Sequence, residues 1–180
     1  MKKTAILLLA CLLAPVARAA VLDATASGFT LENQREVPVD AERAWNALVE
    51  DVDRWWPRDH TWWGKDGRLG IEPRAGGCFC ESDFTGRRQA RHMQVVFVDP
   101  GRLLRLEGGL GPLQGMGLHG VMEFRFEPLE QGGTRITLWY RAGGYTPDDL
   151  AAFAPVVDRV MALQLGGLAD YLGGSAGGEG

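Results

Sequence analysis

Apolar and polar residues alternate most clearly along two stretches in the second half of the chain, within residues 120–127 and 134–141. A period of two predicts β-strands, because successive side chains of a strand point to opposite faces of the sheet. One predicted face is charged and the other is apolar, which is typical of an antiparallel sheet covered on one side. The predicted covered face includes Met122, Phe124, Phe126, Ile136, Leu138 and Tyr140.

Further strands are predicted where short apolar segments are bounded by glycine and proline turns. Asp99-Pro100-Gly101 and Gly132-Gly133 are two of these turns. With the two alternating stretches, the segments make a sheet of about seven strands. The additional predicted strands are residues 29–38, 68–72, 78–83, 91–98 and 103–107.

The end of the chain predicts one long helix. Apolar residues recur at steps of three and four from Leu150 to Leu172. The preceding TPDD, residues 146–149, supplies an N-cap and a proline suited to the first helical position. About 25 residues at about 1.5 Å each give about 37 Å, enough to cross the sheet. Gly166-Gly167 predicts close backbone packing in this helix, with room for a ligand as the alternative.

Two short helices are predicted after the first strand. Asp40 is suited to cap a helix over Ala41–Val49, and Asp51–Trp56 predicts one further turn, ended by Pro57. The order is therefore strand, short helices, six strands and long helix. This order predicts an α+β fold in which a curved antiparallel sheet grips the C-terminal helix.

The first nineteen residues have the pattern of a signal peptide. A basic start precedes the apolar run Ala5–Leu13, and Ala17-Arg18-Ala19 matches a cleavage site. We expect cleavage after Ala19 and a periplasmic or secreted protein, with lipidation at Cys11 as the alternative. The apolar run is too short to span a membrane, so no stable membrane insertion is expected after cleavage.

The mature chain is expected to be acidic. Removing residues 1–19 takes away three basic residues and no acidic one, which moves the formal charge from −4 to −7. An acidic chain without a basic run argues against nucleic acid as a partner. We expect one domain over residues 29–172, between a flexible segment at 20–28 and a glycine-rich tail at 173–180.

Five motifs, in order along the chain, resemble the START-like or SRPBCC superfamily, whose fold is the helix grip. They are VPVDAERAWNAL (37–48), RWW (54–56), EPRAGGCFCE (72–81), VDPGRL (98–103) and GGTRITL (132–138). Within the superfamily, these motifs are most similar to the branch of polyketide cyclases/dehydrases and homologues of the heat-shock ATPase activator.

The resemblance implies an apolar cavity with a few polar groups between the sheet and the long helix. The superfamily includes enzymes, lipid carriers and co-chaperone domains, so the fold does not by itself select a function. Export would separate this chain from a cytosolic ATPase, and the sequence leaves any protein partner unknown. No cofactor is expected.

Glu81 is the main polar candidate for such a cavity. Strand parity places it on the same face as Phe79, which is the predicted covered face. Burial raises the pKa of a carboxyl group and suits it to general acid or base chemistry. The alternative is a structural ion pair with an arginine such as Arg74 or Arg91.

Four of the six tryptophans lie within residues 53–64. Adjacent residues on a helix diverge by about 100°, so one of Trp55-Trp56 is expected to face the core and one the rim. Trp62-Trp63 is expected at the wall and mouth of the cavity. His60 is expected to form a hydrogen bond with Asp59 or with backbone rather than to act in catalysis.

Cys78 and Cys80 lie two residues apart in a predicted strand. Strand geometry would separate their Cα atoms by about 6.6–6.8 Å, the upper limit for a disulfide. A kink at Gly76-Gly77 would permit the bond, and two free thiols are the alternative. The two cysteines point away from the face of Glu81, and the C-x-C spacing is shorter than in structural zinc sites, which disfavours a metal site.

Two main hypotheses for function follow. The first is an exported protein that binds a small, largely apolar ligand in the cavity. The second is a polyketide cyclase or lyase-like enzyme, in which Glu81, with His60 or His92, moves a proton on an enolisable substrate. A docking module with exposed aromatic residues is a third. The residues expected to line the cavity are Trp56, Trp62, Phe79, Glu81, Met116, Tyr140, Phe153 and Met161.

Overall fold

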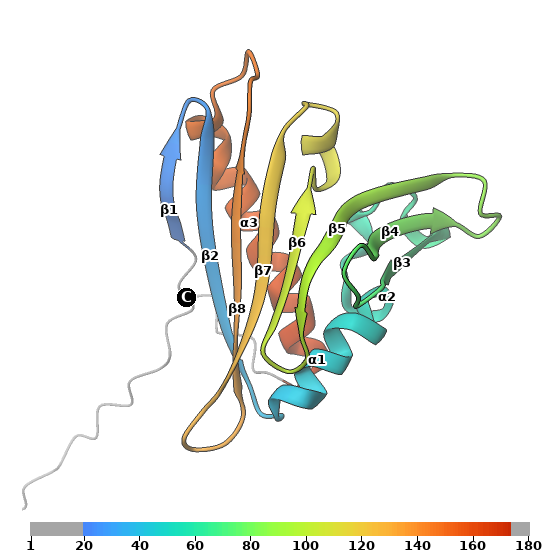
Figure 1. The fold of residues 1–180 in the computed structure, drawn as a ribbon, viewed down its shortest axis with the longest axis vertical. Coiled ribbons are helices and arrows are strands. Elements are labelled where there is room, and N and C mark those ends of the chain that lie inside the picture. Colours follow the sequence, from blue (N-terminus) through green and yellow to red (C-terminus); the bar gives the residue numbers. More distant parts are fainter. Residues whose placement is uncertain (1–19, 174–180) are drawn as a thin grey trace, which may run out of the picture.

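The computed structural model of the protein describes residues 20–173. Within them, eight strands form one antiparallel sheet in the order β1-β2-β8-β7-β6-β5-β4-β3 (Figure 1). The alternation in β7 and β8 is confirmed, since the predicted covered residues of both strands are buried. The strands are β1 (Ala20–Thr25), β2 (Gly28–Val37), β3 (Gly67–Ile71), β4 (Cys78–Asp83), β5 (Gln89–Asp99), β6 (Leu103–Gly108), β7 (His119–Pro128) and β8 (Thr134–Gly143).

Strand β1 corrects the expectation of a flexible segment at residues 20–28. It pairs with β2 at the edge of the sheet, from Ala20 opposite Glu32 to Thr25 opposite Gly28. Its sequence, AVLDAT, does not alternate, and Val21 and Leu22 are exposed. The periodicity that reveals a half-buried strand is therefore missing from this one.

Three helices and three 3₁₀ turns complete the described chain. They are α1 (Ala41–Glu50), α2 (Val52–Trp55), α3 (Leu150–Tyr171), η1 (Arg58–His60), η2 (Gly64–Asp66) and η3 (Gly111–Gln114). Asp40 caps α1 as expected, because its side chain accepts a hydrogen bond of 2.7 Å from the backbone N–H of Arg43.

The predicted start of the long helix was wrong. Asp149 is the N-cap of α3 and its side chain accepts from the backbone N–H of Ala151, whereas Thr146 and Pro147 lie before the helix. The hydroxyl of Thr146 instead accepts from the N–H of Asp148 in a local turn. Both Thr146 and Asp149 are suitable caps by residue type, so the sequence alone did not separate them.

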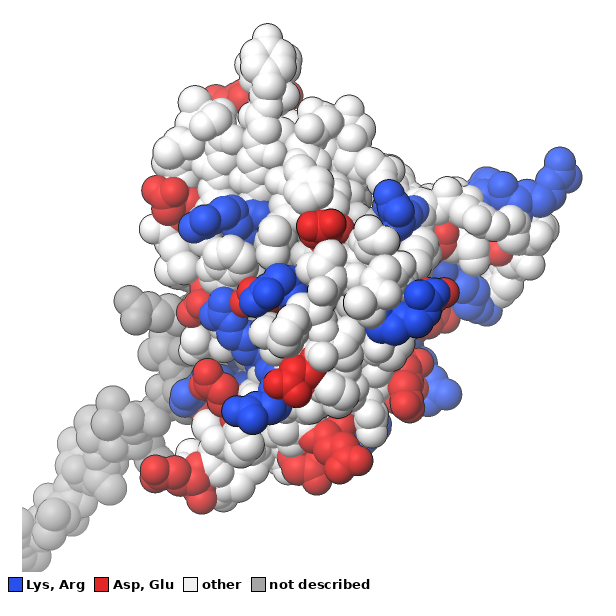
Figure 2. Space-filling model, in the orientation of Figure 1, with Lys and Arg blue, Asp and Glu red and all other residues white. Residues whose placement is uncertain are grey.

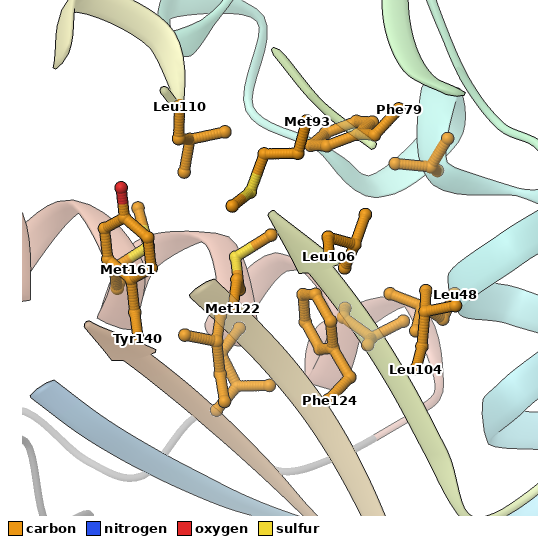
Figure 3. Packing of buried hydrophobic residues seen from close by; sticks show 14 of the residues in the cluster. Leu48, Phe79, Met93, Leu104, Leu106, Leu110, Met122, Phe124, Tyr140 and Met161 are labelled. Atoms are coloured by element: carbon orange, nitrogen blue, oxygen red, sulfur yellow. The ribbon is translucent and has the colours of Figure 1, made fainter. Parts of the chain in front are cut away.

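Helix α3 packs along one face of the sheet, and the core lies between them (Figure 1). Sheet residues Phe124 and Leu106 belong to the same buried cluster as Met161 of α3 and Leu48 of α1 (Figure 3). Within residues 20–173, α3 is the one helix long and apolar enough to cross a membrane. Leu165 and Leu168 on this helix are fully buried in the core.

The opposite face of the sheet carries interspersed charges of both signs (Figure 2). Glu123 on β7 is 7% exposed and accepts hydrogen bonds from Arg105 at 2.6 Å and from Arg125 at 2.7 Å. Burial alone would raise the pKa of Glu123, but the two guanidinium groups hold it below its ordinary value. The charged residues on this face of the sheet thus form ion pairs across neighbouring strands.

Candidate functional site

A cavity of about 310 Å³ opens between α3, the segment that follows α2, and the loop that contains η3. Most of its wall is aromatic or aliphatic, and the polar side chains of His60, His92 and Gln164 also reach it. Among residues 20–173, no Lys or Arg lines the cavity. The main apolar wall residues are Trp56, Trp62, Leu113, Phe153, Val157 and Met161.

Four of the eight residues expected to line the cavity do so, namely Trp56, Trp62, Phe153 and Met161, and the other four do not. Phe79 packs behind Trp56, with ring centroids 5.2 Å apart. Tyr140 lies deeper in the core and points its hydroxyl toward Leu110 (Figure 3). Glu81 is behind His92, and Met116 is outside the lining although its glycine-rich loop does border the cavity.

Sequence reasoning missed the remaining wall residues of α3. Val157, Val160 and Gln164 follow Phe153 at helical steps of three and four, so they share its face. Extending the helical face from Phe153 would have found them. Leu113 of η3 gave no comparable signal, because its place depends on how the loop folds.

A β-bulge places His92 on the covered face of the sheet. In the pairing of β4 with β5, Phe79 lies opposite Met93 and Cys80 opposite Arg91, so His92 is the extra residue. His92 and Met93 are consequently both buried, at 6% and 1% exposure, although they are adjacent in a strand. Without the bulge they would point to opposite faces.

Glu81 is fully buried and binds three donors. Its Oε2 accepts from the backbone N–H of Trp62 at 2.9 Å, and its Oε1 accepts from the N–H of Trp63 at 3.0 Å. The third contact joins Oε2 to His92 Nε2 at 3.2 Å. An ion pair with Arg74 or Arg91 is therefore not present; Arg74 pairs with Glu72 instead. Glu81 links β4 to the cavity wall and orients the His92 ring.

The environment keeps His92 neutral near neutral pH. Burial lowers its pKa, and the contact with Glu81 opposes this shift without cancelling it. A carboxylate only accepts hydrogen bonds, so Nε2 carries the proton of the neutral ring and Nδ1 is an acceptor. Among the described residues, none forms a hydrogen bond with Nδ1.

His60 contacts α3 rather than Asp59 or backbone, which corrects the expectation from the sequence. Its Nδ1 lies 3.1 Å from Gln164 Nε2 and accepts the amide hydrogen. Gln164 is 2% exposed, and its Oε1 has no hydrogen-bond partner among residues 20–173. Gln164 is thus a lining residue of the cavity that carries a buried, unsatisfied acceptor.

The tryptophans do not form an exposed patch. Trp55 and Trp56 are both 6% exposed, so the expected division between core and rim was wrong. Trp56 has left the helix and is extended, with φ −68° and ψ 127°, which turns its ring inward. Their indole N–H groups donate to the carbonyl groups of Ala47 and His60. Trp62, at 48% exposure, stands at the mouth of the cavity.

Cys78 and Cys80 form a disulfide, with Cα atoms 5.4 Å apart. This separation is shorter than in a regular strand, and the pairing of β4 with β5 shifts register between Phe79 and Cys80, within the same segment. Within residues 20–173, no group of three or more His, Cys, Asp and Glu side chains is placed to hold a metal ion. Cys11 and the proposed cleavage site lie outside the described residues.

The family model described as "Polyketide cyclase / dehydrase and lipid transport" matches residues 28–173, and the chain belongs to this family of the SRPBCC superfamily. The predicted helix-grip fold is confirmed. No curated protein sequence matches the chain. The family description is compatible with ligand binding and with cyclase-like chemistry, and it names no particular ligand.

Solved structures with the same fold come from several bacteria. SA2116 from Staphylococcus aureus matches with a TM-score of 0.61 at 13% identity, over 81% of this chain and 94% of that chain. Mll3558 from Rhizobium loti matches with 0.59 at 20% identity, over 81% and 97%. A protein from Rhodobacter sphaeroides matches with 0.56 at 19% identity, over 87% and 98%. At these identities the likeness establishes the fold alone.

Proposed function

We propose that the protein binds a small, largely apolar ligand in the cavity between α3, the segment that follows α2 and the η3 loop. The observation that carries this proposal is a cavity of about 310 Å³ whose wall is mainly aromatic and aliphatic. Pockets for small molecules commonly have about 300–1,000 Å³ and a mostly apolar lining with few polar groups. Trp62 at the mouth would cover the bound ligand.

The location of binding is a further part of the proposal. With residues 1–19 as a signal peptide, the protein would meet its ligand outside the cytoplasm. Native mass spectrometry of protein purified from the periplasm would report the cleaved mass, the disulfide and any copurified ligand together. A mass that retains residues 1–19 would contradict export by cleavage.

Two neighbouring valines of α3 provide a test of the cavity. Val157 lines it and is 7% exposed, whereas Val156 is 42% exposed and does not line it. We expect Val157→Phe to fill part of the space and to weaken binding of N-phenyl-1-naphthylamine, an apolar fluorescent probe, at least about ten-fold. Val156→Phe adds the same group outside the cavity and should bind like the wild type. Equal binding by the two variants would contradict the proposal.

The contact between Glu81 and His92 favours a second candidate, an enzyme of the cyclase or lyase type. With Nε2 held 3.2 Å from the carboxylate, His92 would accept a substrate proton at Nδ1 while Glu81 stabilises the imidazolium. An enolisable diketone such as 1-phenyl-1,3-butanedione should then exchange its acidic hydrogens with deuterium oxide faster in the presence of the protein. His92→Gln should abolish this acceleration and His119→Gln, at an exposed position outside the cavity, should retain it.

A further inference from the structure

The polar groups of the cavity are mostly hydrogen-bond acceptors. Gln164 Oε1 is buried without a partner, although the amide nitrogen of the same side chain is engaged by His60. His92 Nδ1 is an acceptor as well, because Nε2 of that ring donates to Glu81. A buried acceptor without a donor is unfavourable, and such groups normally have a partner in the functional state of a protein.

Of Gln164, His92 and His60, the last provides a hydrogen-bond donor. His60 receives the Gln164 amide hydrogen at Nδ1, so its own proton is on Nε2. A group that both donates and accepts would therefore satisfy Gln164 Oε1 and a neighbouring histidine. A hydroxyl group has this property, whereas an ether oxygen only accepts.

The charges around the cavity argue against an anionic ligand. In the part of the chain that the structure describes, no Lys or Arg lines it, and Asp59 is the one acidic residue of the lining. A carboxylate would lose its hydration here without gaining a cation, and it would face the unsatisfied oxygen of Gln164. Fatty acid anions are disfavoured for the same reason.

We propose that the ligand is a neutral apolar molecule that carries a hydroxyl group and donates its hydrogen to Gln164 Oε1. This inference rests on the proposed apolar cavity and specifies the chemical class that it selects. The hydrocarbon part of the ligand contacts Trp56, Phe153 and Met161, and the hydroxyl end lies at Gln164 and the two histidines.

Three probes of one ring system separate these features: 2-naphthol, 2-methoxynaphthalene and 2-naphthoate. Isothermal titration calorimetry at pH 7.5 should give the tightest binding for 2-naphthol. One additional hydrogen bond corresponds to about a three- to ten-fold difference over the methyl ether. The carboxylate should bind more weakly than either neutral probe.

Gln164→Leu removes the acceptor and keeps an apolar side chain of similar size. In this variant the preference for 2-naphthol over 2-methoxynaphthalene should fall to less than about two-fold, with the ether binding retained. Gln89→Leu, at an exposed position on β5, is the matched control and should keep the preference. Thermal melting of each variant verifies that it is folded.

Each alternative result has a defined meaning. Equal or tighter binding of the ether or the carboxylate by the wild type would overturn the hydroxyl assignment and leave the apolar cavity intact. A preference for 2-naphthol that survives in Gln164→Leu would overturn the role of Gln164. If none of the three probes binds at millimolar concentration, the proposed function itself fails, and this inference fails with it.

Discussion

Two adjacent glycines of α3 should respond oppositely to the same substitution. A Cβ atom on Gly167 would lie 2.6 Å from the carbonyl oxygen of Trp55, whereas one on Gly166 would meet nothing within 4 Å. Gly167 is thus a position where α3 approaches the end of α2 through backbone contact. The structure supports the predicted close packing for the second glycine and gives no such reason for the first.

The size of each effect follows from these distances. Alanine in a helix interior is more favourable than glycine by about 1 kcal/mol, so Gly166→Ala should stabilise the protein by about that amount. In Gly167→Ala the same gain is opposed by a contact well below the 3.4 Å at which ordinary van der Waals contact begins. The neighbour is backbone and cannot rotate away, and overpacking of this kind costs about 1–3 kcal/mol. Gly166→Ala should therefore exceed Gly167→Ala in stability by about 1–3 kcal/mol.

Urea unfolding of both variants, followed by tryptophan fluorescence, measures this difference directly. Thermal unfolding is an independent assay, in which the melting temperature should differ by about 2–4 °C for each kcal/mol of stability in a chain of this size. Equal stability of the two variants, or a more stable Gly167→Ala, would refute the argument that backbone contact with Trp55 fixes the distance between α2 and α3.

Three further predictions concern the buried polar groups. Glu81→Gln should cost about 2–3 kcal/mol in urea unfolding, because an amide presents a donor to one of the backbone N–H groups of Trp62 and Trp63; an unchanged midpoint would contradict this role. The pKa of His92 is lowered by burial, so the unfolded chain binds more protons and stability should rise with pH up to about 6.5. His92→Gln should flatten this rise between about pH 5.5 and 6.5, and an unaltered slope would exclude His92 as its source. A hydrogen bond from Arg88 lowers the pKa of Asp83 from 3.8 to about 2, so the stability that this carboxylate contributes is present above about pH 4 and is lost toward pH 2. In thermal melting, the stability of Asp83→Asn should fall less than that of the wild type between about pH 4 and about pH 2. An equal fall in both proteins would contradict a stabilising pair of Asp83 and Arg88.

Much of the fold could be predicted because its elements are marked by local patterns. Alternation located β7 and β8, glycine and proline turns separated the central strands, and Asp40 marked the start of α1. Prediction failed where a segment had no such local pattern, or where it offered two equally suitable residues for one role. Edge strand β1 has no alternation, and residues 146–149 offer more than one suitable cap.

The sequence also determined which face of β4 is covered, and with it the burial of Phe79 and Glu81, because strand parity needs only a count of residues. It did not determine what Glu81 contacts. That depended on the tertiary structure. The bulge adds one residue to β5 and turns His92 inward, and the loop between η1 and η2 aims the backbone N–H groups of Trp62 and Trp63 at the carboxylate. A one-residue shift in the pairing of two strands depends on both strands together, so the bulge cannot be predicted from the sequence of either strand alone.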